Sequence, residues 1–285
     1  LEEFLPNELI NQHDLEPIMS ALNKIHFPEN ILDSQQGRHR FQFEELFMEL
    51  INVEKRKHEW YASNKSVQIK PDDEKINQFI NKIPFTLTED QKIAVEQIIQ
   101  DLNKEHPMNR LLEGDVGTGK TIVAIISAYL TYLNGYKTLY MAPTEILANQ
   151  HFETFKQFLP DLKIELNTSS SKIENEDWDI LIGTHALLFT EEKYEKVALI
   201  VIDEQHRFGV EQRGKIKNLV KGNKTPHVLT MTATPIPRTL ALTIYGDLDI
   251  SVLKTHPNKE RKITTKVVPE KLRDQAYEWI RNQKE

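Results

Sequence analysis

Residues 114–121 combine glycines, a lysine and a threonine at a spacing that suits phosphate binding. They read Gly-Asp-Val-Gly-Thr-Gly-Lys-Thr, which fits the P-loop pattern, and they follow an expected strand and precede an expected helix, as that pattern requires. The glycines let backbone N–H groups turn toward phosphate oxygens at the positive end of the helix. Lys120 would neutralise the β- and γ-phosphates, and the Thr121 hydroxyl would coordinate Mg²⁺. The sequence therefore predicts an ATP and Mg²⁺ site whose nucleotide-binding residues are Gly114, Asp115, Val116, Gly117, Thr118, Gly119, Lys120 and Thr121.

Two acidic residues follow the most apolar run of the sequence. Residues 197–202 are aliphatic throughout and are expected to form a buried strand. Asp203 and Glu204 would then emerge at its carboxyl end, where open α/β sheets bind their ligands. Asp203 is placed to hold Mg²⁺ through water, and Glu204 to orient and deprotonate the water that attacks the γ-phosphate. We therefore predict Lys120, Asp203 and Glu204 as catalytic residues, and Thr121 and Asp203 as metal-binding residues; an isolated Asp-Glu pair would instead be explained as solvated loop acids.

A glutamine ahead of the P-loop has two possible roles. Thr88 with Gln91 three residues later fits a capping box in front of an amphipathic helix. The side-chain amide of Gln91 could also pair with the edge of an adenine base. The spacing alone favours the capping box, and both roles stay open at this point.

The elements that would position these residues alternate along the chain. From residue 83 onward, short apolar strands alternate with longer amphipathic helices, which is typical of parallel βαβ units in a doubly wound sheet. The strands are expected at 110–113, 138–141, 164–167, 179–182, 197–202 and 227–231, and the helices are expected to begin near Gln91, Lys120, Glu145 and Gln212. The predicted fold class is α/β.

The segments before and after this region have a different pattern of apolar and polar residues. Apolar residues at positions 43, 46, 47, 50 and 51 predict a helix over 35–61, most simply a packing helix without chemistry, and the polar stretch 62–73 is expected to be a linker. A turn at 256–259, a strand at 263–268 and a helix at 271–283 are expected after the sheet, too few elements for a core of their own. The predicted organisation is a helical linker over 1–73, one lobe over 74–255 and the start of a second lobe over 256–285.

The composition limits the class of protein. Hydrophobic residues make up 39% and charged residues 28%, within the globular range, and the longest aliphatic run is too short to span a bilayer. There is no cysteine, which excludes disulfides, thiolate zinc sites and cysteine nucleophiles. We expect a cytoplasmic protein of bacterial type, with no membrane partner. The net charge of −7 argues weakly against nucleic acid as a partner, but backbone amides at helix N-termini can bind phosphates without a basic surface.

Six segments, in this order, resemble the first-lobe motifs of superfamily 2 helicases. They are Phe85 with Gln91, the P-loop, and residues 142–148, 183–187, 203–210 and 232–240. The longer stretches MAPTEILANQH, DEQHRFGVEQR and TATPIPRTLALTIYGDLDIS are more specific and resemble the RecG family of branched-DNA helicases. Transcription-repair coupling factors are similar over RFGV and TPIPR, but they differ where this chain has Gln205 and TEIL.

The resemblance implies a RecA-like P-loop NTPase lobe of an ATP-dependent translocase that acts on replication forks and Holliday junctions in recombination and repair. It implies ATP and Mg²⁺ as cofactors and branched or duplex DNA, bound independently of sequence, as the partner. It favours adenine recognition by Phe85 and Gln91, with the capping role retained. It assigns to contact with the DNA backbone Pro143, Thr144, Glu145, Gly183, Thr184 and His185, which could instead form plain strand-to-helix turns. It assigns to coupling between nucleotide and DNA the residues Gln205, His206, Thr232, Thr234 and Arg238.

Two departures from the family pattern affect these expectations. The stretch 166–171 lacks the glycine expected in a DNA-contacting loop, so its serines receive no DNA role. The resemblance also places 1–73 after a wedge domain and 256–285 at the start of a second lobe, so the wedge domain and the arginine finger of the second lobe are expected outside this chain. We therefore expect the chain alone to hydrolyse ATP poorly. A binding module without turnover is the alternative, and six helicase motifs in order argue against a small-molecule kinase.

Overall fold

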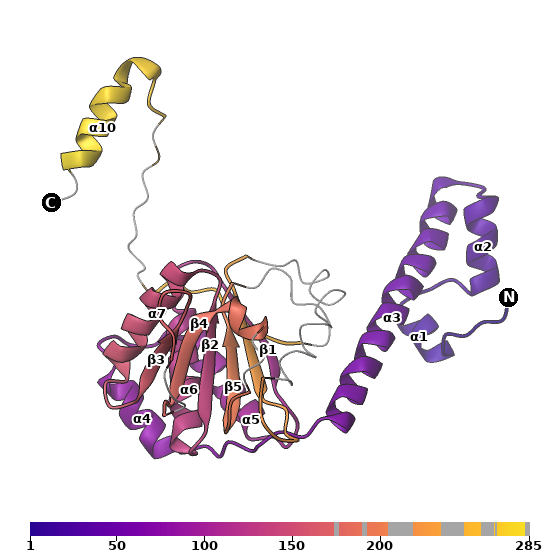
Figure 1. Cartoon of the computed structure of the whole chain (residues 1–285). Helices are drawn as coiled ribbons and strands as arrows, with labels where there is room; N and C mark the ends of the chain where they lie inside the picture. The colour runs from indigo at the N-terminus through magenta and orange to yellow at the C-terminus, as the bar shows by residue number, and fades with distance from the viewer. Residues whose placement is uncertain are drawn as a thin grey trace.

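The computed structural model describes residues 1–173, 177–189, 193–204, 219–234, 248–257, 265 and 267–282. Figure 1 shows a group of N-terminal helices, a sheet with helices packed on it, and a C-terminal helix that stands apart from the sheet. The outer elements are α1 (Asn7–Gln12), α2 (Ile18–His26), α3 (Ile31–Ser63), the 3-10 helix η2 (Glu270–Leu272) and α10 (Arg273–Asn282). None of the described helices combines the length and the apolar character needed to cross a membrane.

The sheet in the described part of the chain has seven strands, and every neighbouring pair is parallel. The strands are β1 (Asn109–Gly114), β2 (Lys137–Ala142), β3 (Ile164–Asn167), β4 (Ile180–Thr184), β5 (Val197–Ile202), β6 (His227–Thr232) and β7 (Asp249–Leu253). They lie in the order β3-β4-β2-β5-β6-β1-β7. The predicted α/β fold with a doubly wound parallel sheet is confirmed.

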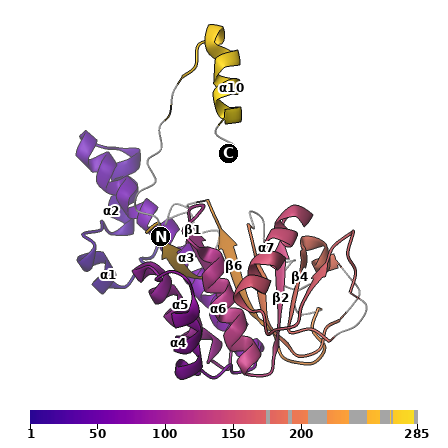
Figure 2. The same cartoon turned by 90° about the vertical axis from the view of Figure 1, so that its left-hand side faces the viewer.

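Both faces of the sheet are buried. On β2, Tyr140 belongs to the core cluster that includes side chains of four helices, while Leu139 belongs to a second cluster; on β5, Leu199 and Ile200 divide in the same way. The four helices are α4 (Asp73–Lys82), α5 (Glu89–Leu102), α6 (Lys120–Leu133) and α7 (Glu145–Phe158), and Figure 2 shows them on one side of the sheet. Because parallel strands are covered on both faces, β5 reads as a continuous apolar run instead of an alternating one.

Most of the elements expected inside the lobe are confirmed. The six expected strands form within two residues of their expected ends, and α5, α6 and α7 begin at Glu89, Lys120 and Glu145. The helix expected near Gln212 lies outside the described residues. Helix α4 and strand β7 were not predicted. Strand β7 carries Asp249 and Ser251, and these polar residues interrupt the apolar pattern by which a buried strand is recognised. The strand tolerates them because each has a polar partner in the fold.

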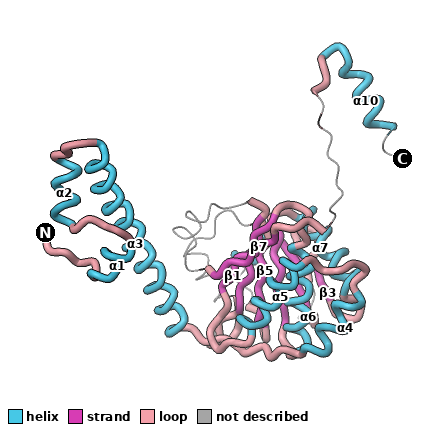
Figure 3. The backbone as a smooth tube through the Cα atoms, turned by 180° about the vertical axis from the view of Figure 1, so that it is seen from behind, coloured by secondary structure: helices cyan, strands magenta, loops and turns pink. Residues whose placement is uncertain are grey.

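The N-terminal segment is more helical than expected. Helix α3 contains the predicted helix 35–61 and begins earlier, where the side chain of Asn30 accepts a 3.0 Å hydrogen bond from the Asp33 amide. Figure 3 shows α3 leading away from the sheet. Part of the stretch 62–73, expected as a polar linker, is packed against the lobe: the Ile69 side chain is fully buried, and its amide donates to the Leu102 carbonyl over 2.9 Å.

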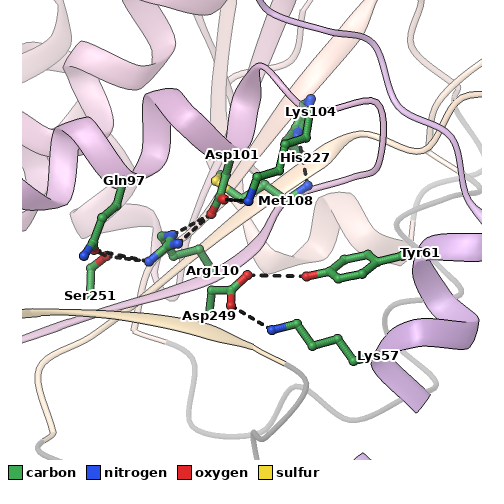
Figure 4. Close-up of polar contacts among 10 residues, drawn as sticks. All are labelled: Lys57, Tyr61, Gln97, Asp101, Lys104, Met108, Arg110, His227, Asp249 and Ser251. Atoms are coloured by element: carbon green, nitrogen blue, oxygen red, sulfur yellow. Dashed lines mark hydrogen bonds and ion pairs between the residues drawn. The ribbon is translucent and has the colours of Figure 1, made fainter. Parts of the chain in front are cut away.

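The C-terminal end of α3 is joined to the edge strand β7 by three side chains, which we call the α3–β7 clasp (Figure 4). The Lys57 ammonium lies 2.8 Å from one carboxylate oxygen of Asp249, and the Tyr61 hydroxyl lies 3.4 Å from the other. Beyond β7, the amides of Lys254 and Thr255 donate to the Asp90 carboxylate, over 2.9 and 2.7 Å, at the start of α5. Strand β7 therefore connects α3 to the helix that carries Gln91.

Buried polar groups fill the space behind the clasp (Figure 4). Arg110 on β1 forms an ion pair with Asp101 at 2.7 Å and donates to the Ser251 hydroxyl at 2.9 Å. His227, fully buried at the start of β6, accepts from the Met108 amide through Nδ1 and donates to a backbone carbonyl, that of Val67, through Nε2. The Arg110–Ser251 contact thus ties β7 to β1, and the His227–Val67 contact ties the 64–69 segment to β6.

Only part of the predicted second-lobe start, residues 256–285, lies within the described residues. Of the strand expected at 263–268, the described residues 265, 267 and 268 have no strand structure, and the others lie outside the described residues. The helix expected at 271–283 is confirmed by η2 and α10.

Candidate active site

The predicted phosphate and acid residues meet at one edge of the sheet. The P-loop follows β1, Asp203 follows β5, and β6 lies between these two strands. Because all three strands are parallel, their carboxyl ends share the edge at which open α/β sheets bind ligands. Thr232, the last residue of β6, lies between the P-loop and the acidic pair.

The P-loop presents backbone groups and one cation. Gly117 and Gly119 have φ values of +86° and +82°, a region that glycine adopts without strain. Gly119 is the N-cap of α6, so the first amides of this helix have no capping side chain and are available to an anion. The Lys120 ammonium donates to the carbonyls of Gly114 and Asp115 at 2.7 and 3.1 Å. Burial lowers the pKa of Lys120, while the charges of the nearby Asp203, Glu204 and Asp115 carboxylates act in the opposite direction.

Gln91 joins the start of α5 to the P-loop. Its side-chain oxygen accepts from the Thr88 amide at 2.8 Å, and its own amide donates to the Thr88 hydroxyl at 3.3 Å, so the predicted capping box is confirmed. The side-chain nitrogen donates to the Thr118 carbonyl at 2.8 Å, a contact that the sequence did not indicate. A Cβ atom at Gly119 would overlap this nitrogen, and the φ of +82° there also favours glycine. Adenine recognition by Gln91 stays a prediction.

Phe85, the second residue expected near adenine, lies at the surface. Its side chain is 43% exposed, and it contacts Phe158 edge to face with ring centres 6.2 Å apart. The structure therefore leaves an aromatic face open beside the segment that leads into α5.

Two residues that the sequence analysis missed hold the Asp203 side chain. His151, on α7, places Nε2 2.8 Å from Asp203 Oδ2, and the Tyr140 hydroxyl lies 3.3 Å from each ring nitrogen of His151. Burial, together with the charge of Asp203 and a hydrogen bond to it, raises the pKa of Tyr140, which keeps its hydroxyl protonated. A signal was present: position 151 falls on the face of α7 that buries Ala148 and Phe155, where a histidine is unusual.

The backbone of the acidic pair is also fixed. The Asp203 amide donates to the Met141 carbonyl at 2.8 Å, and the Asp203 carbonyl lies 3.2 Å from His185 Nε2. Burial lowers the pKa of His185, so its uncharged form is favoured. Glu204 has a φ of +49°, a left-handed conformation that is strained for a residue with a side chain and that occurs preferentially at functional sites.

The residues assigned to DNA lie on the other half of the same edge. Pro143 and Thr144 follow β2, and Gly183 and Thr184 end β4, which is the neighbour of β2. The Thr144 hydroxyl caps α7 by accepting a 3.3 Å hydrogen bond from the Leu147 amide. This cap agrees with the alternative interpretation, in which Thr144 is part of a plain strand-to-helix turn. Gly183 also has a packing role, because a Cβ atom there would overlap the Asn167 carbonyl of β3.

The Glu145 carboxylate is occupied by a loop to which no DNA role was assigned. It accepts from the hydroxyls of Thr168 at 2.9 Å and of Ser169 at 2.6 Å, and it also contacts the Ser170 hydroxyl. These hydrogen bonds lower the pKa of Glu145 to about 2. The loop therefore lies beside the N-terminus of α7, next to Thr144.

Some predicted coupling residues can be placed. The hydroxyls of Thr232 and Thr234 lie 2.9 Å apart, and the Thr234 amide donates to the Thr232 hydroxyl at 3.2 Å. Gln205, His206 and Arg238 lie outside the described residues.

Known proteins are similar to this chain in both sequence and fold. Residues 88–243, more than half of the chain, match the model of the DEAD/DEAH box helicase family. The ATP-dependent DNA helicase RecG of Synechocystis sp. is 41% identical over 99% of this chain and 35% of the relative, and that of Streptococcus pneumoniae serotype 4 is 38% identical over 98% and 43%.

A solved structure, described as RecG bound to a three-way DNA junction, aligns with a TM-score of 0.79 and 33% identity over 99% of this chain and 39% of that one. The chain thus spans about two fifths of the length of these relatives. The predicted resemblance to RecG helicases is confirmed, and the chain belongs to the DEAD/DEAH box helicase family.

Proposed function

We propose that this chain is the ATP-binding motor lobe of an ATP-dependent DNA helicase that remodels branched DNA, such as replication forks and Holliday junctions, in recombination and repair. One observation carries the proposal: the P-loop, the Asp203-Glu204 pair and the Thr144 and Thr184 turns all lie along a single edge of the sheet. Nucleotide chemistry and DNA contact would therefore take place along one edge of the same sheet.

The residues on the nucleotide half fit ATP with Mg²⁺. The α6 amides and the Lys120 ammonium would hold the phosphates in a cradle that glycines keep open. The Thr121 hydroxyl and the Asp203 carboxylate are oxygen donors of the kind that Mg²⁺ binds. Bound Mg²⁺ would neutralise charge on the phosphate oxygens. Glu204, next to Asp203, would orient the attacking water and accept its proton.

The residues on the other half fit a phosphate backbone better than base edges. Thr144 sits at the N-terminus of the 14-residue helix α7, where backbone amides and the helix dipole favour an anion. Contacts of this kind position DNA without reading its sequence. We therefore propose that Pro143, Thr144, Glu145, Gly183, Thr184 and His185 face the DNA backbone, and that Thr232 and Thr234, with Gln205, His206 and Arg238, couple the two halves.

The preference for branched DNA is drawn from the relatives. The solved relative is described as bound to a three-way junction, and this chain aligns with about two fifths of it. We propose that further parts of a longer protein, a wedge domain and a second motor lobe, select the junction and complete the ATPase site. This chain alone would then bind ATP and turn it over poorly, because an arginine finger typically contributes 10³–10⁵ in rate.

ATP hydrolysis by the full-length protein that contains this chain would test the proposal. Rates would be measured with single-stranded, duplex, forked and four-way DNA at several salt concentrations, with Lys120→Ala as the inactive control. We expect the strongest stimulation by branched DNA and a steep loss of DNA binding as salt rises. Equal rates with and without every DNA would contradict the helicase proposal, and a preference for one base sequence would contradict the backbone contacts.

A further inference from the structure

Helix α7 contacts the predicted metal-binding carboxylate directly. We propose that His151 is a positioning residue for magnesium: its imidazole fixes the orientation of the Asp203 carboxylate. The proposal rests on the proposed function, because it takes Asp203 as a residue that helps to bind the Mg²⁺ of ATP. It extends that function, since residue 151 lies well within α7 and away from the turns discussed above.

The first argument is the hydrogen bond itself. His151 Nε2 donates to Asp203 Oδ2 over 2.8 Å, and the two side chains are only 12% and 10% exposed. Rotation of an aspartate carboxylate about its last bond is otherwise broad. A short bond to one oxygen, largely shielded from bulk water, restricts that rotation and thus sets the direction of the second oxygen. Hydrogen bonds to an ionised carboxylate are also stronger than neutral ones.

The second argument is that the imidazole is itself held in place. The Tyr140 ring lies 4.8 Å from the His151 ring, and Phe155 contacts Tyr140 edge to face with ring centres 5.1 Å apart. Tyr140 is fully buried on β2, and its hydroxyl lies 3.3 Å from each ring nitrogen of His151. The histidine is therefore fixed by the packing of α7 on β2 and has little freedom to follow the carboxylate.

The third argument concerns what packing alone would select. The face of α7 that carries Ala148 and Phe155 is apolar and fully buried at those two positions. A polar ring between them loses solvation, which is unfavourable unless it gains a hydrogen bond, and an aliphatic residue would fill the space without that penalty. The hydrogen bond to Asp203 accounts for a histidine here. Partners of this kind typically change metal affinity 10- to 100-fold when they are removed.

Binding of a fluorescent ATP analogue to the chain, titrated with Mg²⁺, tests the inference without relying on turnover. His151→Phe keeps a ring and removes the donor, His151→Gln keeps an N–H donor, and Gln150→Ala changes an exposed neighbour on the same helix. For His151→Phe we expect the Mg²⁺ concentration at half-maximal effect to rise about tenfold, with nucleotide affinity in the absence of Mg²⁺ unchanged. His151→Gln should recover most of this change, and Gln150→Ala should match the unaltered chain.

The outcomes separate the two proposals. If the unaltered chain shows Mg²⁺-dependent nucleotide binding and a folded His151→Phe shows the same dependence, the positioning role is wrong and the ATP site stands. If the unaltered chain binds nucleotide without any effect of Mg²⁺, the proposed ATP–Mg²⁺ site is wrong, and the role of His151 with it. Circular dichroism would verify folding, and should the phenylalanine variant not fold, His151→Leu provides the same comparison with a smaller side chain.

Discussion

The ammonium of Lys57, on α3, lies 2.8 Å from the carboxylate of Asp249, the first residue of β7, although the two residues are 192 positions apart. Burial of Asp249 opposes its ionisation, but the hydrogen bond and charge of Lys57, with the charge of Arg110, hold its pKa below the usual value. The clasp is therefore an ion pair at the junction between a helix that leaves the lobe and the edge strand beside β1.

Asp249→Asn should loosen this junction. The variant keeps the shape of the side chain and removes the charge partner of Lys57, and because the pair is only partly buried we expect a loss of about 1 kcal/mol. Hydrogen exchange of the amides at 57–63 should become about fivefold faster. Glu89→Gln, which breaks the exposed Lys92 pair on α5, serves as the control and should change little. Unchanged exchange at 57–63 in Asp249→Asn would show that the clasp does not hold α3.

His227 should make the stability of the lobe depend on pH. Burial lowers the pKa of His227 to about 4 from an ordinary value near 6.5, although its hydrogen bond to the Val67 carbonyl acts in the opposite direction. Between pH 4 and 6.5, the unfolded chain therefore binds a proton at His227 that the folded chain does not bind. The free energy of unfolding should fall by about 3 kcal/mol as pH drops from 6.5 to 4, and the full contribution is present above 6.5.

Urea unfolding at several pH values would measure this effect. Carboxylates also titrate at the acidic end, so the informative quantity is the difference between the unaltered chain and His227→Gln. The variant should be less stable at pH 7 and should show a shallower fall between pH 6.5 and 4. Parallel pH curves would mean that another group is responsible.

Gly119→Ala should damage the P-loop more than backbone strain alone can explain. Gly119 and Gly135 have similar φ values, +82° and +76°, but a Cβ atom at Gly119 overlaps the Gln91 side chain, whereas one at Gly135 has no atom within 4 Å. Strain alone amounts to about 1 kcal/mol for alanine in this conformation. Gly135→Ala is thus a matched control. We expect a larger loss of unfolding free energy, and weaker nucleotide binding, only in Gly119→Ala; equal losses would mean that Gln91 simply moves aside.

Glu204→Gln should separate binding from hydrolysis in the full-length protein. The amide keeps the size of the side chain and removes the base, while Asp203 and Thr121 remain for Mg²⁺. We expect nucleotide binding within a factor of two or so and hydrolysis reduced about 10²- to 10⁴-fold. Single-turnover measurements with the protein in excess of ATP, repeated over a range of protein concentrations, would give both quantities. Normal hydrolysis by this variant would place the base elsewhere.

The sequence predicted those parts of the site that are contiguous in the chain. The P-loop and the acidic pair carry their own pattern, and the alternation of strands and helices places both at the same sheet edge. Contacts between distant segments were missed: Gln91 meets Thr118 27 positions away, and His151 meets Asp203 52 positions away. Nothing local marks such partners except a polar residue on a buried helix face.

The same reason explains the errors outside the site. Strand β7 was missed because Asp249 and Ser251 look like residues of a loop until Lys57 and Arg110 are placed beside them. The 62–73 stretch looked like a linker because its polar residues hide the fully buried Ile69. In both places, charged and polar side chains taken as solvated have partners inside the fold.

The length of α3 gives the clasp a mechanical meaning. From Lys57 back to Ile31 the helix rises through 26 residues, an arm of about 39 Å, whereas β7 on the other side of the joint ends at Leu253 and is paired with β1 along its whole length. Because β7 is held in the sheet, a sideways load at the start of α3 acts on the clasp with the full length of this arm. The residues that follow β7, Lys254 and Thr255, are bound to Asp90, the neighbour of Gln91, so the point that takes this load lies one strand away from the P-loop.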